Sequence, residues 1–213
     1  MTEKPLKYQA YALIRQKIIN CEYAPGAFIT ENLLQETVPG SRTPVRDAIG
    51  RLEQENLVTI FPKKGILVAP VLPKDISSLF QLRMMWEPYA VQKYGNMLSC
   101  DFYMSFYDHF FSADLRDNRQ HYEKDDEFHT AFIQATNNPY ILRVYEQIHV
   151  HLHRSRVWVG NTDAVRLEAS QEEHQRILLA CIKKDWDLAA EMMQEHLACS
   201  RMSTLTELAM KMK

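Results

Sequence analysis

The stretch SRTPVRDAIGRLEQENLV, residues 41–58, decides how the first third of the chain folds. Its opening Ser and Thr are helix-capping residue types, and Pro44 stands in the first turn, where a helix does not use the backbone N–H that proline lacks. Apolar residues then recur at helical spacing, at Val45, Ala48, Ile49 and Leu52. The stretch therefore predicts a helix that buries this stripe and leaves Arg42, Thr43 and Arg46 facing solvent.

Two shorter helices are predicted before this one. Residues 8–21 form the first, because their apolar side chains recur at helical spacing, and the Ala24-Pro25-Gly26 turn ends it. Thr30, followed by Glu31, has the character of an N-cap and opens the second helix, which is broken at Pro39-Gly40. The spacing of this short helix and the longer one is that of a helix-turn-helix.

A β-hairpin is predicted after the long helix. Residues 58–60 and 66–68 alternate apolar positions with their neighbours on either side of the basic turn Pro62-Lys63-Lys64-Gly65. Three helices followed by a two-stranded wing are the pattern of a winged helix-turn-helix domain. We assign residues 1–70 to it.

Beyond a linker at residues 71–74, only helices are predicted. We expect them at 75–97, 101–116, 119–136, 139–158, 165–183 and 186–210. Pro88 lies inside the first of these helices and should kink it. The expected fold class is mainly α, with the winged helix-turn-helix joined to an all-α antiparallel helical bundle over residues 75–213.

Composition and charge indicate a globular protein and exclude a membrane-spanning one. The chain has 213 residues, 46% apolar and 24% charged, which is typical of a globular protein. Residues 1–70 carry 9 basic and 7 acidic residues, which leaves 16 basic and 20 acidic residues for 71–213 from totals of 25 and 27. There is no secretory signal, no apolar run of membrane-spanning length and no CxxC pair, so we expect a cytoplasmic protein that does not contact a membrane.

The solvent-facing side of the long helix has the chemistry of a DNA reader. Guanidinium groups at Arg42 and Arg46 suit guanine edges, while the hydroxyls of Ser41 and Thr43 and the helix N-terminus suit phosphates. The basic wing tip, Lys63-Lys64-Gly65, can reach neighbouring phosphates. Two arginines alone would more often be an ordinary solvated face, but the capped helix, the short helix before it and the hairpin after it together favour DNA binding.

Four residues of the helical body form a candidate metal site. Asp125 and His129 are four residues apart, so they share a helix face, although such a pair is also an ordinary polar contact. His174 and His196 lie eleven residues before and after Asp185, where a helical hairpin turns, so an antiparallel pair brings them level. Each of them alone would more often be a hydrogen-bonded core residue. Together with Asp125 and His129, they would make a carboxylate and three imidazoles, which suit Zn, Ni, Mn or Fe with positions left open.

The N-terminal motifs resemble those of a known family. APGAFITENLLQE (24–36), SRTPVRDAIGRLEQENLV (41–58) and PKKG (62–65) are similar, in order and spacing, to the winged-helix domain of the GntR family of bacterial transcription regulators. The resemblance implies that a homodimer binds an inverted-repeat operator in double-stranded DNA, with Gly65 letting the wing approach. Two positions depart from the family pattern: Pro39-Gly40 replaces an apolar-ended turn, and Gly50 stands where leucine is common.

The helical body is similar to the FCD ligand-binding domain of the FadR subfamily of these regulators, in its shorter, VanR-like form of six helices. The matching motifs are the DxxFH from Asp125 to His129, the NNP at 137–139, the EEH that ends at His174 and the EHL around His196. The resemblance implies that these Asp and His residues hold a divalent metal, and that the metal holds the carboxylate of a small organic acid.

Other polar residues of the body are candidates for effector binding. Each of Arg83, Arg154 and Arg156 could provide a guanidinium fork for a carboxylate. Arg83 could equally pair with Glu87, four residues further on. His149, His151 and His153 are alternative histidines, which we interpret mainly as interhelical or surface groups.

The sequence therefore predicts a metabolite-responsive transcription regulator, in the form of a repressor, and not an enzyme. The alternative is a metal-dependent enzyme fused to a nucleic-acid-binding domain, since an open metal site can also activate water. Against that alternative, no carboxylate other than Asp125 is clearly placed as a general base. We place Glu172 and Glu173 near a helix start, where acidic residues are common anyway.

Overall fold

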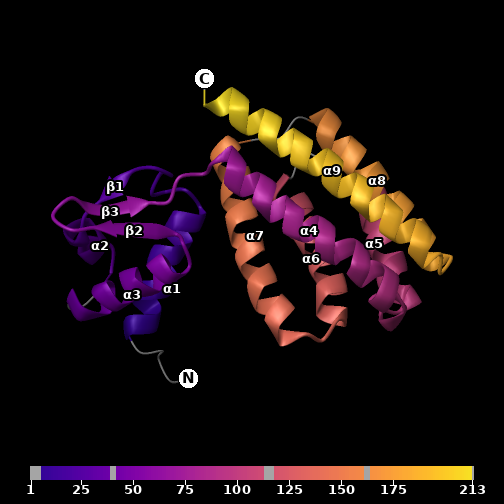
Figure 1. Ribbon diagram of the computed structural model, residues 1–213, viewed down its shortest axis with the longest axis horizontal. Coiled ribbons are helices and arrows are strands. Elements are labelled where there is room, and N and C mark those ends of the chain that lie inside the picture. Colours follow the sequence, from indigo (N-terminus) through magenta and orange to yellow (C-terminus); the bar gives the residue numbers. More distant parts are fainter. Residues whose placement is uncertain (1–5, 39–41, 113–117, 161–163, 213) are drawn as a thin grey trace. The chain divides into compact units, whose positions relative to one another are not determined.

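The computed structural model describes residues 6–38, 42–112, 118–160 and 164–212 (Figure 1). It divides into two compact units. The first extends to Leu72 and takes in His153–Trp158, and the second comprises Pro73–Leu152 and the chain from Val159 onward. Each unit is described by itself.

The first unit contains the predicted helix-turn-helix and wing. Its elements are α1 (Leu6–Ile19), β1 (Phe28–Ile29), α2 (Glu31–Thr37), α3 (Arg42–Gln54), β2 (Val58–Phe61) and β3 (Gly65–Val68). The strands form an antiparallel sheet in the order β1-β3-β2, with Ile60 opposite Ile66 in the hairpin. The hairpin was predicted, whereas β1 was not, because two residues are too few to show an alternating pattern.

Apolar residues predicted to face inward make the core of this unit. The buried residues of α1 and α3 are Ala10, Ile14, Ile18, Val45, Ala48, Ile49 and Leu52. Thr30 caps α2 as predicted, since its side chain accepts a hydrogen bond from the backbone N–H of Leu33 at 3.2 Å. The predicted break at Pro39-Gly40 and the capping role of Ser41 lie outside the described residues.

The second unit is helical, as predicted. Its elements are α4 (Pro73–Tyr94), a 3₁₀ turn (Gly95–Met97), α5 (Cys100–Ser112), α6 (Asn118–Ala135), α7 (Pro139–Val159), α8 (Ala164–Ile182) and α9 (Trp186–Lys211). The first predicted helix changes to a 3₁₀ turn at Gly95, and α4 continues past Pro88 as far as Tyr94. The last residues of the second predicted helix, 113–116, are not among those described.

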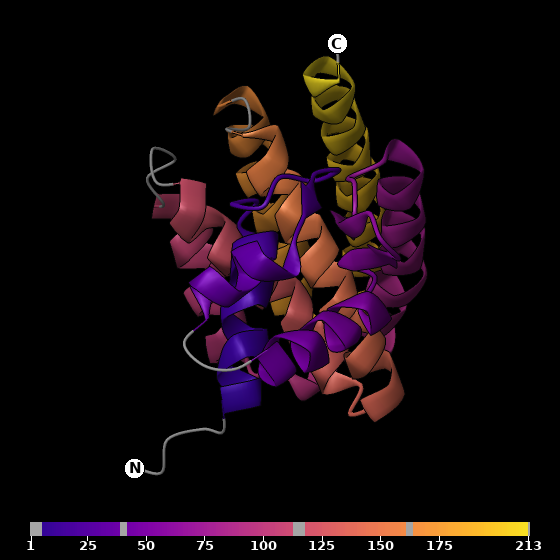
Figure 2. The same cartoon turned by 90° about the vertical axis from the view of Figure 1, so that its left-hand side faces the viewer.

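Helix packing in this unit brings distant parts of the sequence together. Helix α9 packs along α4 and α8, and α5 and α6 cover the other sides of α8 and α4. In both views α4 and α9 run side by side (Figures 1 and 2). An aromatic cluster fills the space between α5 and α6, made of Tyr103, Phe106, Phe110, Phe128 and Phe132. Over the described chain, no helix combines the length and apolar character needed to cross a lipid bilayer.

Candidate functional site

Four buried polar side chains from three helices converge inside the second unit. Asp125 and His129 come from α6, His174 from α8 and His196 from α9, and each offers one ligand atom. These four atoms all lie within 4.8 Å of one another. The structure therefore brings together the four residues that the sequence predicts as metal ligands.

The ligand atoms face one another at short distances. The Nε2 atom of His129 lies 3.3 Å from Nε2 of His174 and 3.2 Å from Nε2 of His196. The Oδ1 atom of Asp125 lies 3.3 Å from Nε2 of His174 and 3.7 Å from Nε2 of His129. A single small cation between these atoms would contact all four of them.

The local sequence explains how the histidines of α8 and α9 become level. Asp185 is the N-cap of α9, and its side chain accepts a hydrogen bond from the backbone N–H of Leu188 at 3.2 Å. The hairpin therefore turns where the sequence places it. The rings of His174 and His196, equidistant from the turn, have centroids 4.3 Å apart.

A buried carboxylate orients His129 from behind. The Nδ1 atom of His129 lies 2.7 Å from Oε2 of Glu87. Glu87 also pairs with the guanidinium of Arg83 and accepts a hydrogen bond from the hydroxyl of Tyr145 at 2.6 Å. Burial alone would raise the pKa of Glu87, but the charges of Arg83 and His129 outweigh it and hold that pKa well below its ordinary value. Glu87 is therefore an anion that favours a proton on Nδ1 of His129.

A second acidic side chain, that of Glu173, lies behind His196. The Oε2 atom of Glu173 lies 2.7 Å from Nδ1 of His196. Arg166 donates two hydrogen bonds to Glu173, at 3.2 and 2.9 Å, and a third to the hydroxyl of Ser200 at 2.9 Å. Glu173 lies in the middle of α8, so our interpretation of it as an acid at a helix start was wrong. Its contact with His196 joins two helices, and no short-range pattern in the sequence indicates it.

Aromatic rings hold His174. Its imidazole stacks on the ring of Phe110, with centroids 4.5 Å apart and planes at 20°, and meets the edge of Phe128 at 5.2 Å. Phe128 precedes His129 in the DxxFH motif, so this motif supplies both a ligand and packing for another ligand.

These contacts favour a cation at the centre of the cluster. Because the Nδ1 atoms of His129 and His196 face carboxylates, their Nε2 lone pairs point towards each other and towards Asp125. Burial and the neighbouring His129 hold the pKa of His196 well below its ordinary value, so His196 is a neutral ligand. Three imidazoles and a carboxylate, with the imidazoles of His129 and His196 oriented from behind, fit a divalent transition metal.

The predicted DNA-reading residues lie at the start of α3. Thr43 and Arg46 are exposed there, and the guanidinium Nε of Arg46 lies 3.0 Å from a carboxylate oxygen of Glu31, at the start of α2. Helix α3 begins at Arg42, whose side chain is not among those described, and Ser41 lies outside the described residues. Sequence reasoning placed Glu31 in a first helical turn but did not anticipate its pairing with Arg46.

The backbone around the wing tip requires glycine at position 65. Lys63 and Lys64 are exposed, as a DNA-contacting wing requires. Gly65 has φ +115°, and a Cβ atom there would lie 2.9 Å from the backbone oxygen of Ile29 in β1. Only glycine therefore allows β3 to approach β1 this closely, whether or not DNA is bound.

The three predicted effector arginines occupy different environments. Arg83 is buried and paired with Glu87, directly behind His129. Arg154 and Arg156 lie in the segment of α7 that belongs to the first unit, where Arg154 donates a hydrogen bond to the backbone oxygen of Ala69 at 2.6 Å. The structure thus places Arg83 beside the cluster, and it does not place Arg154 or Arg156 in the unit that holds the cluster.

Among the alternative histidines, His149 contacts α6. Its Nδ1 atom lies 3.2 Å from Oδ1 of Asp126, and its Nε2 atom lies 3.1 Å from the hydroxyl of Thr130. These contacts fit the interhelical role that we expected. His151 and His153 follow on α7 and are half-buried.

Comparison with curated proteins and solved structures places this architecture among transcription regulators. The chain is 29% identical over 198 residues to a regulator from an unstable DNA locus of Streptomyces ambofaciens, covering 88% of this chain and 80% of that protein. It is 25% identical over 210 residues to the transcriptional repressor GlaR of Escherichia coli K12, covering 88% of this chain and 90% of that protein.

Solved structures show the same fold. McbR/YncC of E. coli superimposes with a TM-score of 0.77 at 20% identity, covering 97% of this chain and all of that one. The Zn²⁺-bound FCD domain of TM0439, a regulator, superimposes with a TM-score of 0.54 at 22% identity, covering 64% of this chain and 95% of that one.

Two family models match successive parts of the chain. The model of the gntR family of bacterial regulatory proteins matches residues 6–68, and the FCD domain model matches residues 78–198. The gntR family and the named relatives are transcriptional regulators and not enzymes, which removes the alternative of a metal-dependent enzyme. The chain is therefore a transcription regulator of the GntR family whose C-terminal part is an FCD domain.

Proposed function

We propose that this protein is a metabolite-responsive repressor that works in the bacterial cytoplasm. In this proposal a homodimer binds an inverted repeat in DNA, and a metal with a bound organic acid in the FCD domain controls that binding. The observation that carries the proposal is the convergence of Asp125, His129, His174 and His196, with two of the histidines oriented by carboxylates. The repressor role is supported by the relative GlaR, which is named a repressor.

The proposed operator contacts come from α3 and the wing. Arg42, Thr43 and Arg46, with Ser41 before them, would contact bases and phosphates in the major groove. Lys63, Lys64 and Gly65 at the wing tip would contact the neighbouring backbone. The exposure of Thr43, Arg46 and both lysines supports these roles.

The proposed metal is Zn²⁺, with Ni, Mn or Fe as alternatives. Asp125, His129, His174 and His196 would hold it, and the Zn²⁺-bound FCD domain of TM0439 supports this choice. A bound divalent cation supplies positive charge and vacant positions for an anionic oxygen. The protein's own part is to present the imidazoles of His129 and His196, which Glu87 and Glu173 orient from behind.

The proposed effector is a small carboxylate, with Arg83, Arg154 and Arg156 as the arginines predicted to bind it. Arg83 lies behind His129, and its guanidinium already pairs with Glu87. An effector carboxylate would therefore bind Arg83 only by sharing it with Glu87. This makes the cation the main attraction for the effector.

A thermal-shift screen of organic acids tests this function. An acid that binds only the folded, metal-loaded protein should raise the free energy of unfolding by roughly 2.7 kcal/mol at a hundredfold excess over its dissociation constant. The same acid should have little effect on protein stripped of metal by a chelator. Equal stabilisation of stripped and loaded protein would contradict the metal-held effector, and hits confined to neutral or cationic compounds would contradict a carboxylate.

A further inference from the structure

Glu31 and Arg46 connect the two helices of the helix-turn-helix at an exposed position. Glu31 is the first residue of α2, and the side chain of Thr30 caps that helix. Arg46 lies in the second turn of α3, next to the buried Val45. Local structure and the core therefore fix the backbone positions of both residues. Their side chains, in contrast, are 41% and 67% exposed.

Stability does not explain this ion pair. Water and salt screen the attraction between exposed charges, so such a pair contributes little to the free energy of unfolding. Holding two long side chains in one geometry also costs them rotamer freedom. What the pair does achieve is to fix the direction of a guanidinium on the side of α3 that is proposed to enter the major groove.

The contact between them occupies one corner of the guanidinium. The Nε atom of Arg46 donates a hydrogen bond to Oε2 of Glu31 at 3.0 Å. The N–H groups on both Nη atoms remain, and no other described residue accepts a hydrogen bond from Arg46. Guanine presents O6 and N7 side by side in the major groove, and two parallel N–H groups match them. Arg46 therefore keeps a complete fork for guanine while Glu31 holds its Nε.

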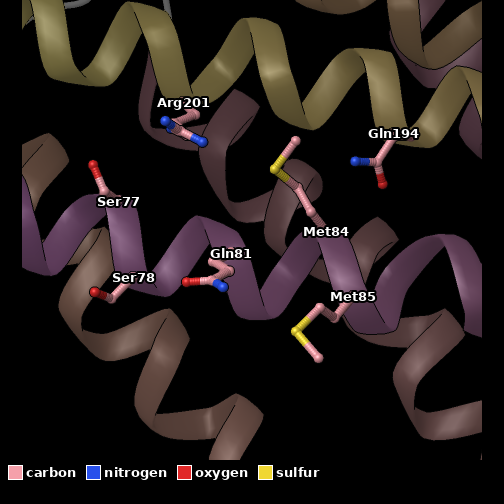
Figure 3. Close-up of a pocket in the computed structure, with 7 residues that line it drawn as sticks. All are labelled: Ser77, Ser78, Gln81, Met84, Met85, Gln194 and Arg201. Carbon is pink, nitrogen blue, oxygen red and sulfur yellow. The ribbon is translucent and has the colours of Figure 1, made fainter.

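The charge of Arg46 is balanced, unlike that of another arginine in the second unit. Arg201 of α9 lines a hollow of about 450 Å³ between α4 and α9, across from Ser77 and Ser78 (Figure 3). Within the described part of the chain, no carboxylate pairs with Arg201, so its positive charge is not offset. Glu31 offsets the charge of Arg46 and would repel a phosphate that approached the same guanidinium. The pair therefore favours a neutral guanine edge over a phosphate.

From these contacts we infer that Glu31 positions Arg46 to read a guanine and thereby sets part of the sequence specificity of this protein. Glu31 acts through Arg46, so it is a positioning residue. Without its carboxylate, Arg46 would be free to pair with a phosphate, and phosphate contacts carry no sequence information. The inference rests on the proposed operator binding by α3 and is independent of the metal and of the effector.

The affinities of full-length protein for two DNA duplexes test this role. Wild-type protein selects one duplex from a random pool, and the other is an unselected duplex of the same length and base composition. Glu31→Gln removes the carboxylate charge at nearly constant size, so the ratio of the two affinities, measured by fluorescence anisotropy, should fall at least about fivefold. Glu36→Gln removes the same charge from an exposed residue of α2 and should leave the ratio unchanged. Equal ratios for the two variants would overturn the inference.

The salt dependence of binding gives a second measurement. If Glu31→Gln lets Arg46 contact a phosphate of the unselected duplex, the slope of log association constant against log salt concentration should steepen by about 0.9. Glu36→Gln should keep the wild-type slope. The same slope for both variants would contradict the claim that Glu31 keeps Arg46 from phosphates.

A double-variant cycle shows whether Glu31 acts through Arg46. In Arg46→Ala protein there is no guanidinium to position, so adding Glu31→Gln should leave the affinity ratio unchanged. A ratio that falls equally with and without Arg46 would overturn the positioning role of Glu31 while leaving operator binding intact. If wild-type protein enriches no sequence from the random pool, the proposed operator binding fails, and the inference fails with it.

Discussion

The proposed metal cluster and the proposed DNA-contacting side of α3 differ in how much of their final arrangement exists before anything binds. The side chain of His174 is fully buried, whereas that of Arg46 is 67% exposed. The Nδ1 atoms of His129 and His196 already face carboxylates, so the direction of their lone pairs is set by the fold. Arg46 has a partner too, in Glu31, but an ion pair between exposed groups contributes little to stability.

This difference separates two ways of building a binding region. Buried polar groups are costly unless they are paired, so the cluster is fixed by packing and is ready for a cation. In the proposed complex, exposed groups at the start of α3 would keep their water until DNA displaces it, so their final positions would depend on the DNA. Changes in the cluster should therefore alter metal binding most, and changes on α3 should alter DNA binding without altering the fold.

The largest expected effect is at a ligand in the buried cluster. His174→Ala removes one of the four proposed metal ligands, so metal affinity should fall by at least about 100-fold. This loss is larger than that expected from changing a residue that only hydrogen-bonds to a ligand. Competition titration against a chromophoric chelator measures this. His149→Ala is the matched control, because His149 is a histidine that contacts α6 outside the cluster. Undiminished metal binding by His174→Ala would mean that the ligands are different residues.

A smaller effect is expected at the carboxylate behind His196. Glu173→Gln keeps the size of the side chain but removes the charge that favours a proton on Nδ1, so metal affinity should fall by about 10- to 100-fold. Its neighbour Glu172 is exposed, and Glu172→Gln is the control. Equal affinities for the two variants would show that Glu173 is held only by Arg166 and does not orient the histidine.

A substitution on the exposed side of α3 should change DNA binding without changing the stability of the fold. Arg46→Ala should weaken operator binding by about 1–3 kcal/mol and relax the preference for one base, if the side chain contacts a base edge. The thermal midpoint should stay close to that of wild type, since the pair with Glu31 is exposed. Fluorescence anisotropy on operator and random DNA measures the change. Equal losses of affinity for operator and random DNA would assign Arg46 to a phosphate contact. A large drop in the thermal midpoint would show that Arg46 also stabilises the fold, unlike an exposed group that acts on DNA binding alone.

Local geometry predicted the two halves of the cluster, and the resemblance to the FCD domain implied that the two halves form one site. The spacing of four from Asp125 to His129 places both on one face, and the equal distances of His174 and His196 from Asp185 place them level. The helices were predicted for the same reason, since their burial follows a period of 3.6 residues.

The orienting carboxylates could not be found in this way. Glu87 is 42 residues from His129, and Glu173 is 23 residues from His196, so each contact depends on how two helices pack. The pair Arg83–Glu87 was anticipated as an alternative to effector binding, but its place behind His129 was not. Strand β1 was missed because its two residues pair with β3, which lies far along the chain.

The turn between α8 and α9 has a consequence for how this chain can change in length. The backbone N–H groups of Lys183, Lys184 and Asp185 all donate to carbonyls of α8, at 2.9–3.1 Å, and Lys184 has φ +60°. Loops on protein surfaces commonly tolerate insertions and deletions. In this turn, however, every residue from Lys183 to Asp185 is tied to α8 by a backbone hydrogen bond. One residue more would break these hydrogen bonds and displace the start of α9, and with it the level of His196 relative to His174. In related proteins, variation in loop length is therefore expected at the other connections between helices. Lys183, Lys184 and Asp185 set a fixed distance along the chain between α8 and α9.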